Sequence, residues 1–218
     1  MRHLLVSKLK SFSQDWLRFV LVPYNFLNLT VSFLFLEAAY VTTQIAGMLA
    51  TKNASNEVTD IIISNFDRVD TSLIHGNLSF FMYDLRFPLF LIFIKYTPFA
   101  AKALAALIFL RAFTINLTNL GMPEGIVPIA SNLTFGGDLF FSGHVANTFM
   151  LGLVFWHIKP LRYVFISISI LFGISAVIGH YHYTIDVVAA PFFAYGVFVI
   201  CKKIFKEDYL QTVNKVKA

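Results

Sequence analysis

Long apolar runs, separated by short polar stretches, are the feature that most limits how this chain can fold. Only 13% of its residues are charged and 57% are hydrophobic, whereas about a quarter of the residues in a soluble domain are charged. Because lipid offers the backbone no hydrogen-bond partners, such runs predict membrane-spanning helices. We therefore expect an all-α membrane protein with six transmembrane helices, near residues 26–48, 79–97, 100–119, 143–158, 161–179 and 184–201.

The two ends of the chain differ from these runs. Residues 1–20 mix basic and apolar side chains, which fits an amphipathic helix at the membrane surface and equally fits an ordinary flanking tail. Residues 21–201 hold the six runs as one domain, and residues 202–218 form a basic tail. The net charge of +5 lies mostly at the ends and in short loops. That distribution favours membrane orientation over nucleic-acid binding.

Lysine and arginine alternate between the connecting segments. The N-terminal segment, the turns near 95–102 and 159–162, and the tail are rich in them, whereas the 120–142 loop and the turn before the sixth run have none. The 51–78 loop is the least clear, with two basic and four acidic residues. The positive-inside rule then predicts that both termini are cytoplasmic. His144, His182 and Asp186 would share the non-cytoplasmic face, at the level of the lipid headgroups.

These three residues suggest phosphoryl transfer. On a helix, the spacing of His182 and Asp186 would put both side chains on one face, where the carboxylate could fix the imidazole tautomer. His182 could then attack phosphorus to form a phosphohistidine. His144 would protonate the departing oxygen and later deprotonate the acceptor. Backbone amides at Gly143, and at Gly136-Gly137, could hold phosphate oxygens.

Three motifs carry a resemblance to a known family. Two of them are Gly137-Asp138-x-x-x-Ser142-Gly143-His144 and His182-Tyr183-Thr184-Ile185-Asp186-Val187-Val188-x-Ala190. They resemble the C-terminal motifs of the sphingomyelin synthase family, which belongs to the wider PAP2, or lipid phosphate phosphatase, superfamily. The third runs from Arg111 through Thr114 to Thr118 ahead of Pro123, and resembles the family's Arg-x-x-Thr-x-x-x-Thr segment.

The resemblance covers about residues 80–200 and implies a PAP2-like helical bundle. It makes His144, His182 and Asp186 the catalytic triad, with His182 as the nucleophile. It also matches Asp138 to an acid that the family keeps beside the histidine motif. The family needs no metal, so we expect none, although two histidines and two aspartates could bind zinc. No cofactor is implied.

Five residues are candidates for substrate binding: Arg111, Asp138, Ser142, Gly143 and His180. Arg111 lies within an apolar run, where it could contact phosphate or form an internal ion pair with Glu37 or Asp84. His180 could line a headgroup pocket, or it could be a solvated histidine in a turn.

The scarcity of cations bears on the substrate. The Lys-x6-Arg-Pro motif of the phosphatase branch is missing, and Ala176 stands where that branch has an arginine after Ser175. A phosphomonoester carries nearly two negative charges and a phosphodiester only one. The sequence therefore favours a diester, with headgroup transfer of phosphocholine or phosphoethanolamine from a membrane phospholipid donor to a ceramide-like lipid alcohol acceptor. Water as the acceptor would give phospholipase C activity. The alternatives are a lipid phosphate phosphatase and a non-enzymatic lipid-binding membrane protein.

Overall fold

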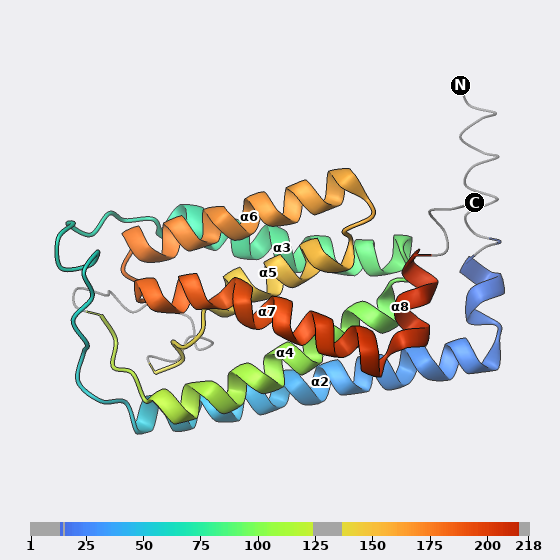
Figure 1. The fold of residues 1–218 in the computed structure, drawn as a ribbon, viewed down its shortest axis with the longest axis horizontal. Coiled ribbons are helices and arrows are strands. Elements are labelled where there is room, and N and C mark those ends of the chain that lie inside the picture. The colour runs from blue at the N-terminus through green and yellow to red at the C-terminus, as the bar shows by residue number, and fades with distance from the viewer. Residues whose placement is uncertain (1–13, 15, 124–136, 214–218) are drawn as a thin grey trace.

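Helices make up all the regular structure in the part of the chain that the computed structural model describes, which is residues 14, 16–123 and 137–213. The prediction of an all-α fold is confirmed. Six helices coincide with the six apolar runs, and a short seventh follows (Figure 1): α2 (Pro23–Lys52), α3 (Ser72–Ile92), α4 (Thr97–Thr118), α5 (Gly143–Val154), α6 (Lys159–Ile178), α7 (Thr184–Ile204) and α8 (Lys206–Val213). The predicted amphipathic segment at 1–20 falls largely outside the described residues.

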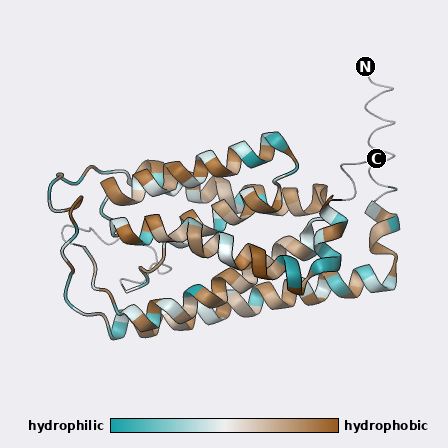
Figure 2. Cartoon of the chain, in the orientation of Figure 1, coloured by the Kyte–Doolittle hydropathy of each residue, from teal (hydrophilic) through white to brown (hydrophobic). Residues whose placement is uncertain are grey.

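Four of these helices are long and apolar enough to cross a membrane: α2, α4, α6 and α7. The colour of hydrophobic residues runs along most of their length in Figure 2. Helix α5 has only 12 residues, and α3 does not meet the same criteria of length and composition. The helices therefore indicate a multi-pass membrane protein, and the expected total of six spans stays a prediction.

Several helix boundaries differ from the sequence prediction, and the start of α3 differs most. Helix α3 begins at Ser72 rather than near residue 79, because its first two turns carry polar residues that hide the apolar pattern of a span. At the other end of the chain, α7 continues to Ile204, and α8 stands where a basic tail was predicted. The earlier start of α3 brings His75 onto a helix.

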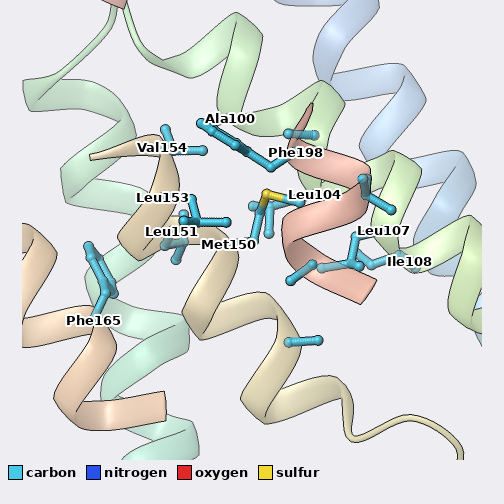
Figure 3. Packing of buried hydrophobic residues seen from close by; sticks show 14 of the residues in the cluster. Ala100, Leu104, Leu107, Ile108, Met150, Leu151, Leu153, Val154, Phe165 and Phe198 are labelled. Atoms are coloured by element: carbon cyan, nitrogen blue, oxygen red, sulfur yellow. The ribbon is translucent and has the colours of Figure 1, made fainter. Parts of the chain in front are cut away.

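The core lies where α5 packs against α4, α6 and α7 (Figure 3). Met150, Leu151 and Val154 of α5 are almost completely buried in it. Helix α4 contributes many small residues to its buried faces, including Ala100, Ala103 and Ala105. Small side chains let helices approach closely, which is how helices associate where lipid removes the hydrophobic driving force. Helix α2 packs along α4, and α3 packs against α6.

One end of the bundle gathers the segments expected to carry chemistry. The end of α4, the start of α3 and the turn between α6 and α7 lie there, whereas the start of α2 and helix α8 lie at the opposite end (Figure 1). The 53–71 segment is hydrogen-bonded across this end. The Val69 amide donates to the Ile178 carbonyl at 3.1 Å, and Thr71 Oγ1 donates to the Ser175 carbonyl at 2.8 Å. This segment therefore covers the end of the bundle where the site lies.

Candidate active site

His182 and Asp186 meet through a helix start rather than along a helix face. Helix α7 begins at Thr184 with Tyr183 as its N-cap, so His182 precedes the helix and the predicted placement on one helical face is wrong. Asp186 is the third residue of α7, and its carboxylate reaches back over the first turn. Its Oδ2 accepts a hydrogen bond from the Tyr183 amide at 3.1 Å and lies 3.4 Å from His182 Nδ1. The helix-capping geometry therefore brings the two side chains together.

The pair is buried and oriented. Asp186 is completely buried and His182 is 7% exposed. The 3.4 Å separation is longer than a typical hydrogen bond. A carboxylate beside Nδ1 favours the tautomer with a proton on that nitrogen, which leaves a lone pair on Nε2. Oδ1 of Asp186 has no hydrogen-bond partner among the described residues.

The start of α5 is tied directly to the start of α7. The amide of Ser142 donates to the Asp186 carbonyl at 3.0 Å. This bond places His144, the second residue of α5, at the same end of the bundle as His182. His144 is half-buried and lies within electrostatic range of His182. The structure thus brings the three predicted catalytic residues to one place.

Ser142 begins α5 without capping it. Ser142 is the N-cap residue and is completely buried, but its hydroxyl makes no capping hydrogen bond and has no partner among the described residues. The first amides of a helix lack partners within the helix, and they carry partial positive charge. The start of α5 therefore offers a hydroxyl and amides such as that of Gly143 to an anion. Gly137, by contrast, donates its amide to Thr51 Oγ1 at 3.0 Å, so the predicted use of that amide for phosphate is wrong. Gly136 lies outside the described residues.

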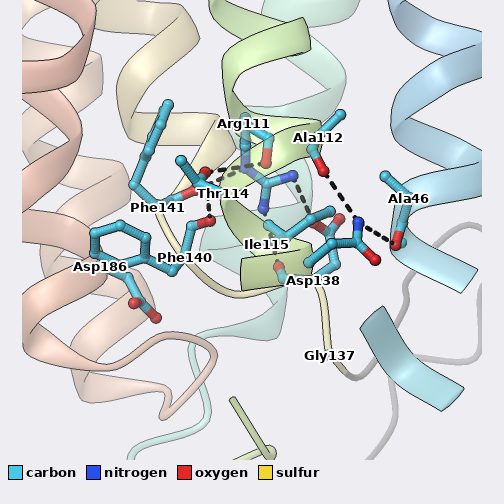
Figure 4. Close-up of polar contacts among 12 residues, drawn as sticks. Ala46, Arg111, Ala112, Thr114, Ile115, Gly137, Asp138, Phe140, Phe141 and Asp186 are labelled. Atoms are coloured by element: carbon cyan, nitrogen blue, oxygen red, sulfur yellow. Dashed lines mark hydrogen bonds and ion pairs between the residues drawn. The ribbon is translucent and has the colours of Figure 1, made fainter. Parts of the chain in front are cut away.

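Arg111 holds the segment that leads into α5 (Figure 4). Its Nε donates to the Phe141 carbonyl at 2.6 Å, and one terminal nitrogen donates to the Asp138 carbonyl at 2.9 Å. The other terminal nitrogen forms an ion pair of 2.6 Å with the Asp138 carboxylate. The internal ion pair of Arg111 is therefore with Asp138 and not with Glu37 or Asp84, which are both exposed.

Gly143 makes room for this arginine. A Cβ atom at residue 143 would lie 3.0 Å from Arg111 Nε, closer than side chains normally pack. Arg111, Asp138 and Gly143 thus form one unit that fixes where α5 starts. The guanidinium makes two hydrogen bonds and one ion pair in this unit.

His180 ends the turn after α6 in a left-handed conformation. Its φ is 57°, and the Tyr181 amide donates to the Ala176 carbonyl while the His180 amide donates to the Val177 carbonyl. This is the hydrogen-bond pattern of a Schellman motif, in which glycine is usual at the position of His180. His180 is only 7% exposed, so the alternative of a solvated turn histidine is wrong. It lines a cavity of about 840 Å³ together with Tyr183, Pro123 and residues of the 57–68 segment.

Two residues near the site were missed by the sequence analysis. His75 of α3 lies against His144, with 4.9 Å between ring centroids. Asp60 accepts hydrogen bonds from the Thr184 amide at 2.7 Å and from Thr184 Oγ1 at 2.8 Å, and so caps α7 from a distant part of the chain. Neither residue belongs to a motif, and only the tertiary fold brings them to the site.

Electrostatics around the α7 start are dominated by carboxylates. Partial burial alone raises the pKa of Asp60, but hydrogen bonds from Thr184, Ile63 and Ile62 outweigh it and hold the pKa below its ordinary value of 3.8. Burial raises the pKa of the Tyr183 hydroxyl, and the charges of Glu57, Asp186 and Asp60 raise it further. Asp60 is therefore ionised at neutral pH beside the start of α7, which carries Asp186. Within residues 14, 16–123 and 137–213, no group of three or more His, Cys, Asp or Glu side chains is placed to hold a metal ion.

A scan against family models finds one match that includes this site. Residues 136–203 match the model described as PAP2 superfamily C-terminal. The match supports the PAP2 superfamily. It contains His144, His182 and Asp186, and it agrees with chemistry on phosphate esters of lipids. No curated protein and no solved structure matches the chain. The narrower resemblance to sphingomyelin synthases stays a prediction.

Proposed function

We propose that this protein is a phospholipid headgroup transferase of the sphingomyelin synthase type. It would move phosphocholine or phosphoethanolamine from a glycerophospholipid to a ceramide-like lipid alcohol. The observation that carries the proposal is the direct tie between the starts of α5 and α7, which brings His144 together with the His182–Asp186 pair. A nucleophile with an orienting acid and a second acid/base group are the parts that covalent phosphoryl transfer needs.

In the first step, Nε2 of His182 attacks phosphorus and the bond from phosphorus to the diacylglycerol oxygen breaks. His144, as an imidazolium, gives its proton to that oxygen. The products are diacylglycerol and a phosphohistidine that carries the headgroup. Asp186 stabilises the positive charge that develops on the His182 ring, because its buried carboxylate lies beside Nδ1.

In the second step, the hydroxyl oxygen of the acceptor lipid attacks the same phosphorus. His144, now neutral, takes the hydroxyl proton, and the phosphorus–nitrogen bond breaks. His182 returns to its starting state and His144 is again an imidazolium. Water in place of the lipid alcohol would give the phospholipase C reaction by the same steps.

The anion site at the start of α5 favours a singly charged phosphodiester. The Ser142 hydroxyl and the first amides of α5 are available to phosphate oxygens. The charge of Arg111 is already neutralised by Asp138, and Asp60 and Asp186 add negative charge nearby. Further positive charge comes from Arg68, which lines the cavity, and from Arg86, which acts on His144, and a phosphomonoester with nearly two negative charges would need more of it than a phosphodiester.

The second candidate is a PAP2-type lipid phosphate phosphatase. The family match fits it equally well, and Ser175 and His182 keep the spacing of the phosphatase motif. In both cases we propose that the site opens on the non-cytoplasmic side and that both termini are cytoplasmic. The Lys/Arg-poor connections lie at the end of the bundle that holds the site, and the start of α2 and helix α8 lie at the other.

Turnover of different lipid substrates by the purified protein separates these candidates. One reaction contains labelled phosphatidylcholine or phosphatidylethanolamine, with and without ceramide. A separate reaction contains phosphatidic acid. The His182→Ala variant is the control in both. Ceramide-dependent release of diacylglycerol supports the transferase. Phosphate release from phosphatidic acid alone supports the phosphatase. Turnover that is unchanged in His182→Ala would overturn both.

A further inference from the structure

His75 is a third histidine at the site, and no motif includes it. It is the fourth residue of α3 and is only 7% exposed. Its ring makes an edge-to-face contact with the His144 ring, with centroids 4.9 Å apart and planes at 71°. The rings of Phe172 and Tyr181 lie on its other sides, at 5.3 and 5.1 Å. An ionisable side chain buried among aromatic rings at the end of a helix bundle calls for a physical reason.

The two proposed catalytic histidines are oriented by different means. His182 lies beside the carboxylate of Asp186, whereas the His144 ring has no hydrogen-bond partner among the described residues. What the structure places against the His144 ring are two other rings: His75 at 4.9 Å and Phe172 at 5.1 Å. The orientation of His144 therefore depends on packing, and on whatever fixes those two rings.

The ring of His75 is itself fixed by a hydrogen bond. Its Nδ1 lies 2.9 Å from Oγ of Ser175. The single proton of that hydroxyl is already directed to the Phe172 carbonyl, which can only accept, at 3.0 Å. Both contacts are made at once when Ser175 donates to the carbonyl and accepts from His75, and this arrangement has the proton of His75 on Nδ1 and the lone pair on Nε2. The contact gives the ring a defined orientation.

We propose that His75 is a positioning residue of the active site, anchored on Ser175, whose ring holds the imidazole of His144 in the orientation that acid/base catalysis requires. Other titratable and charged groups also act on His144: Arg86 from α3, Arg111 from α4, and His182 before α7. The proposal rests on the proposed function only in giving His144 an acid/base role.

Four variants test the proposal. His75→Asn keeps an N–H donor near Ser175 but removes the ring against His144, and His75→Phe keeps a ring but loses the anchor. Ser175→Ala removes the anchor alone. His157→Asn is the matched control, because His157 is exposed and lies at the opposite end of α5. Circular dichroism and thermal unfolding establish that each variant is folded before its activity is compared.

The kinetic readout is kcat for diacylglycerol release from phosphatidylcholine across pH. In His75→Asn we expect kcat to fall ten- to a hundredfold, with KM within twofold and the acidic limb of the kcat profile displaced. The kcat values of His75→Phe and Ser175→Ala should lie between those of His75→Asn and the wild type. A folded His75→Asn protein with the wild-type kcat and pH profile would overturn the proposal. A loss that appears only in KM would overturn it too.

A second readout does not need turnover. Nitrogen-15 NMR of labelled histidines should give His75 the Nδ1–H tautomer in the wild type and a different or averaged tautomer in Ser175→Ala. The rate at which diethylpyrocarbonate modifies His144, followed by mass spectrometry, should rise severalfold in His75→Asn and stay unchanged in His157→Asn. An unchanged modification rate, or an Nε2–H tautomer for His75, contradicts the proposal. If the wild type turns over none of the lipids, the proposed function fails, and these measurements still decide whether His75 positions His144.

Discussion

Two buried polar clusters lie at opposite ends of the bundle, and they differ in how completely they are paired. At the α8 end, Lys102 Nζ lies 2.7 Å from Asp208 Oδ2 and donates to Asn28 Oδ1 at 2.6 Å. Asn28 Nδ2 in turn donates to Asp208 Oδ1 at 2.6 Å. Each side chain of this cluster therefore satisfies the other two, as buried polar groups in proteins generally do.

The cluster at the other end is open. Oδ1 of Asp186 and the hydroxyl of Ser142 are buried without a hydrogen-bond partner among the described residues, and the His144 ring packs against the rings of His75 and Phe172. Leaving a buried polar group unpaired costs about 1–3 kcal/mol. The closed cluster stabilises the fold by itself. An oxygen of a bound phosphate ester would accept from the Ser142 hydroxyl, whereas Asp186 Oδ1 can only accept and would need a separate donor.

Asp186→Asn should have the largest effect of these variants, and it should act on activity far more than on stability. The amide cannot stabilise a positively charged His182 ring, so we expect kcat for phospholipid turnover to fall by roughly 10²–10⁴-fold. Stability should change much less, because the amide oxygen can still accept from the Tyr183 amide. Steady-state kinetics and thermal unfolding of the same preparation check both parts. An unchanged kcat would show that the carboxylate does not orient His182.

Asp208→Ala should show the opposite pattern. Removing the carboxylate leaves the charge of Lys102 without an ionic partner, with only the hydrogen bond to Asn28, and breaking such a buried pair costs about 3–5 kcal/mol of stability. The activity of each folded molecule should stay at the wild-type level, because the cluster lies at the other end of the bundle from the site. Chemical unfolding in detergent and kinetics normalised to folded protein measure the two effects. A specific loss of turnover in this variant would mean that the closed cluster also serves the site.

His180→Gly should stabilise the protein slightly while weakening the site. Glycine adopts the left-handed conformation at residue 180 without the cost of about 1 kcal/mol that a side chain pays there. The melting temperature should therefore rise, while KM for the phospholipid should increase through loss of an imidazole that lines the cavity. His180→Ala, which loses the imidazole but keeps the backbone strain, is the control. If His180→Gly is less stable than the wild type, the side chain has a structural role instead.

Asp60→Asn should have the smallest effect, and its pH dependence has a defined sign. Because the pKa of Asp60 is held below 3.8 in the folded protein, ionised Asp60 adds stability at pH values above 3.8. That contribution is lost as the pH falls through the lower, folded-state pKa. The difference in stability between the wild type and Asp60→Asn should be constant near neutral pH and vanish only below about pH 4. A gap that closes between pH 6 and pH 8 would assign the effect to another group.

The sequence predicts the helices and points to the candidate site residues because both depend on short-range patterns. Apolar runs alone locate six helices, and two short motifs contain His144, His182 and Asp186. The local geometry was harder to predict. The four-residue spacing of His182 and Asp186 suits both a helix face and a capped helix start. Only the observed start of α7 at Thr184 decides between them.

Contacts between distant segments were not predictable from these patterns. Burial of Arg111 implied a partner, but Asp138 lies in a loop with no periodic signal and its motif gave no hint of an ion pair. His75 and Asp60 were missed for the same reason, since α3 and the 53–71 segment reach the site only through tertiary packing. The polar start of α3 was a usable signal in retrospect, because a helix that begins at Ser72 turns His75 into the bundle.

Covalent trapping on His182 tests the central claim most directly. Phosphatidylcholine labelled in its phosphate is mixed with the protein in the absence of an acceptor, quenched in alkali within milliseconds and digested for mass spectrometry. The account predicts an alkali-stable, acid-labile phosphocholine group on His182, formed together with diacylglycerol and lacking in His182→Ala. Diacylglycerol release that proceeds without label on this histidine, or that persists in His182→Ala, would contradict it.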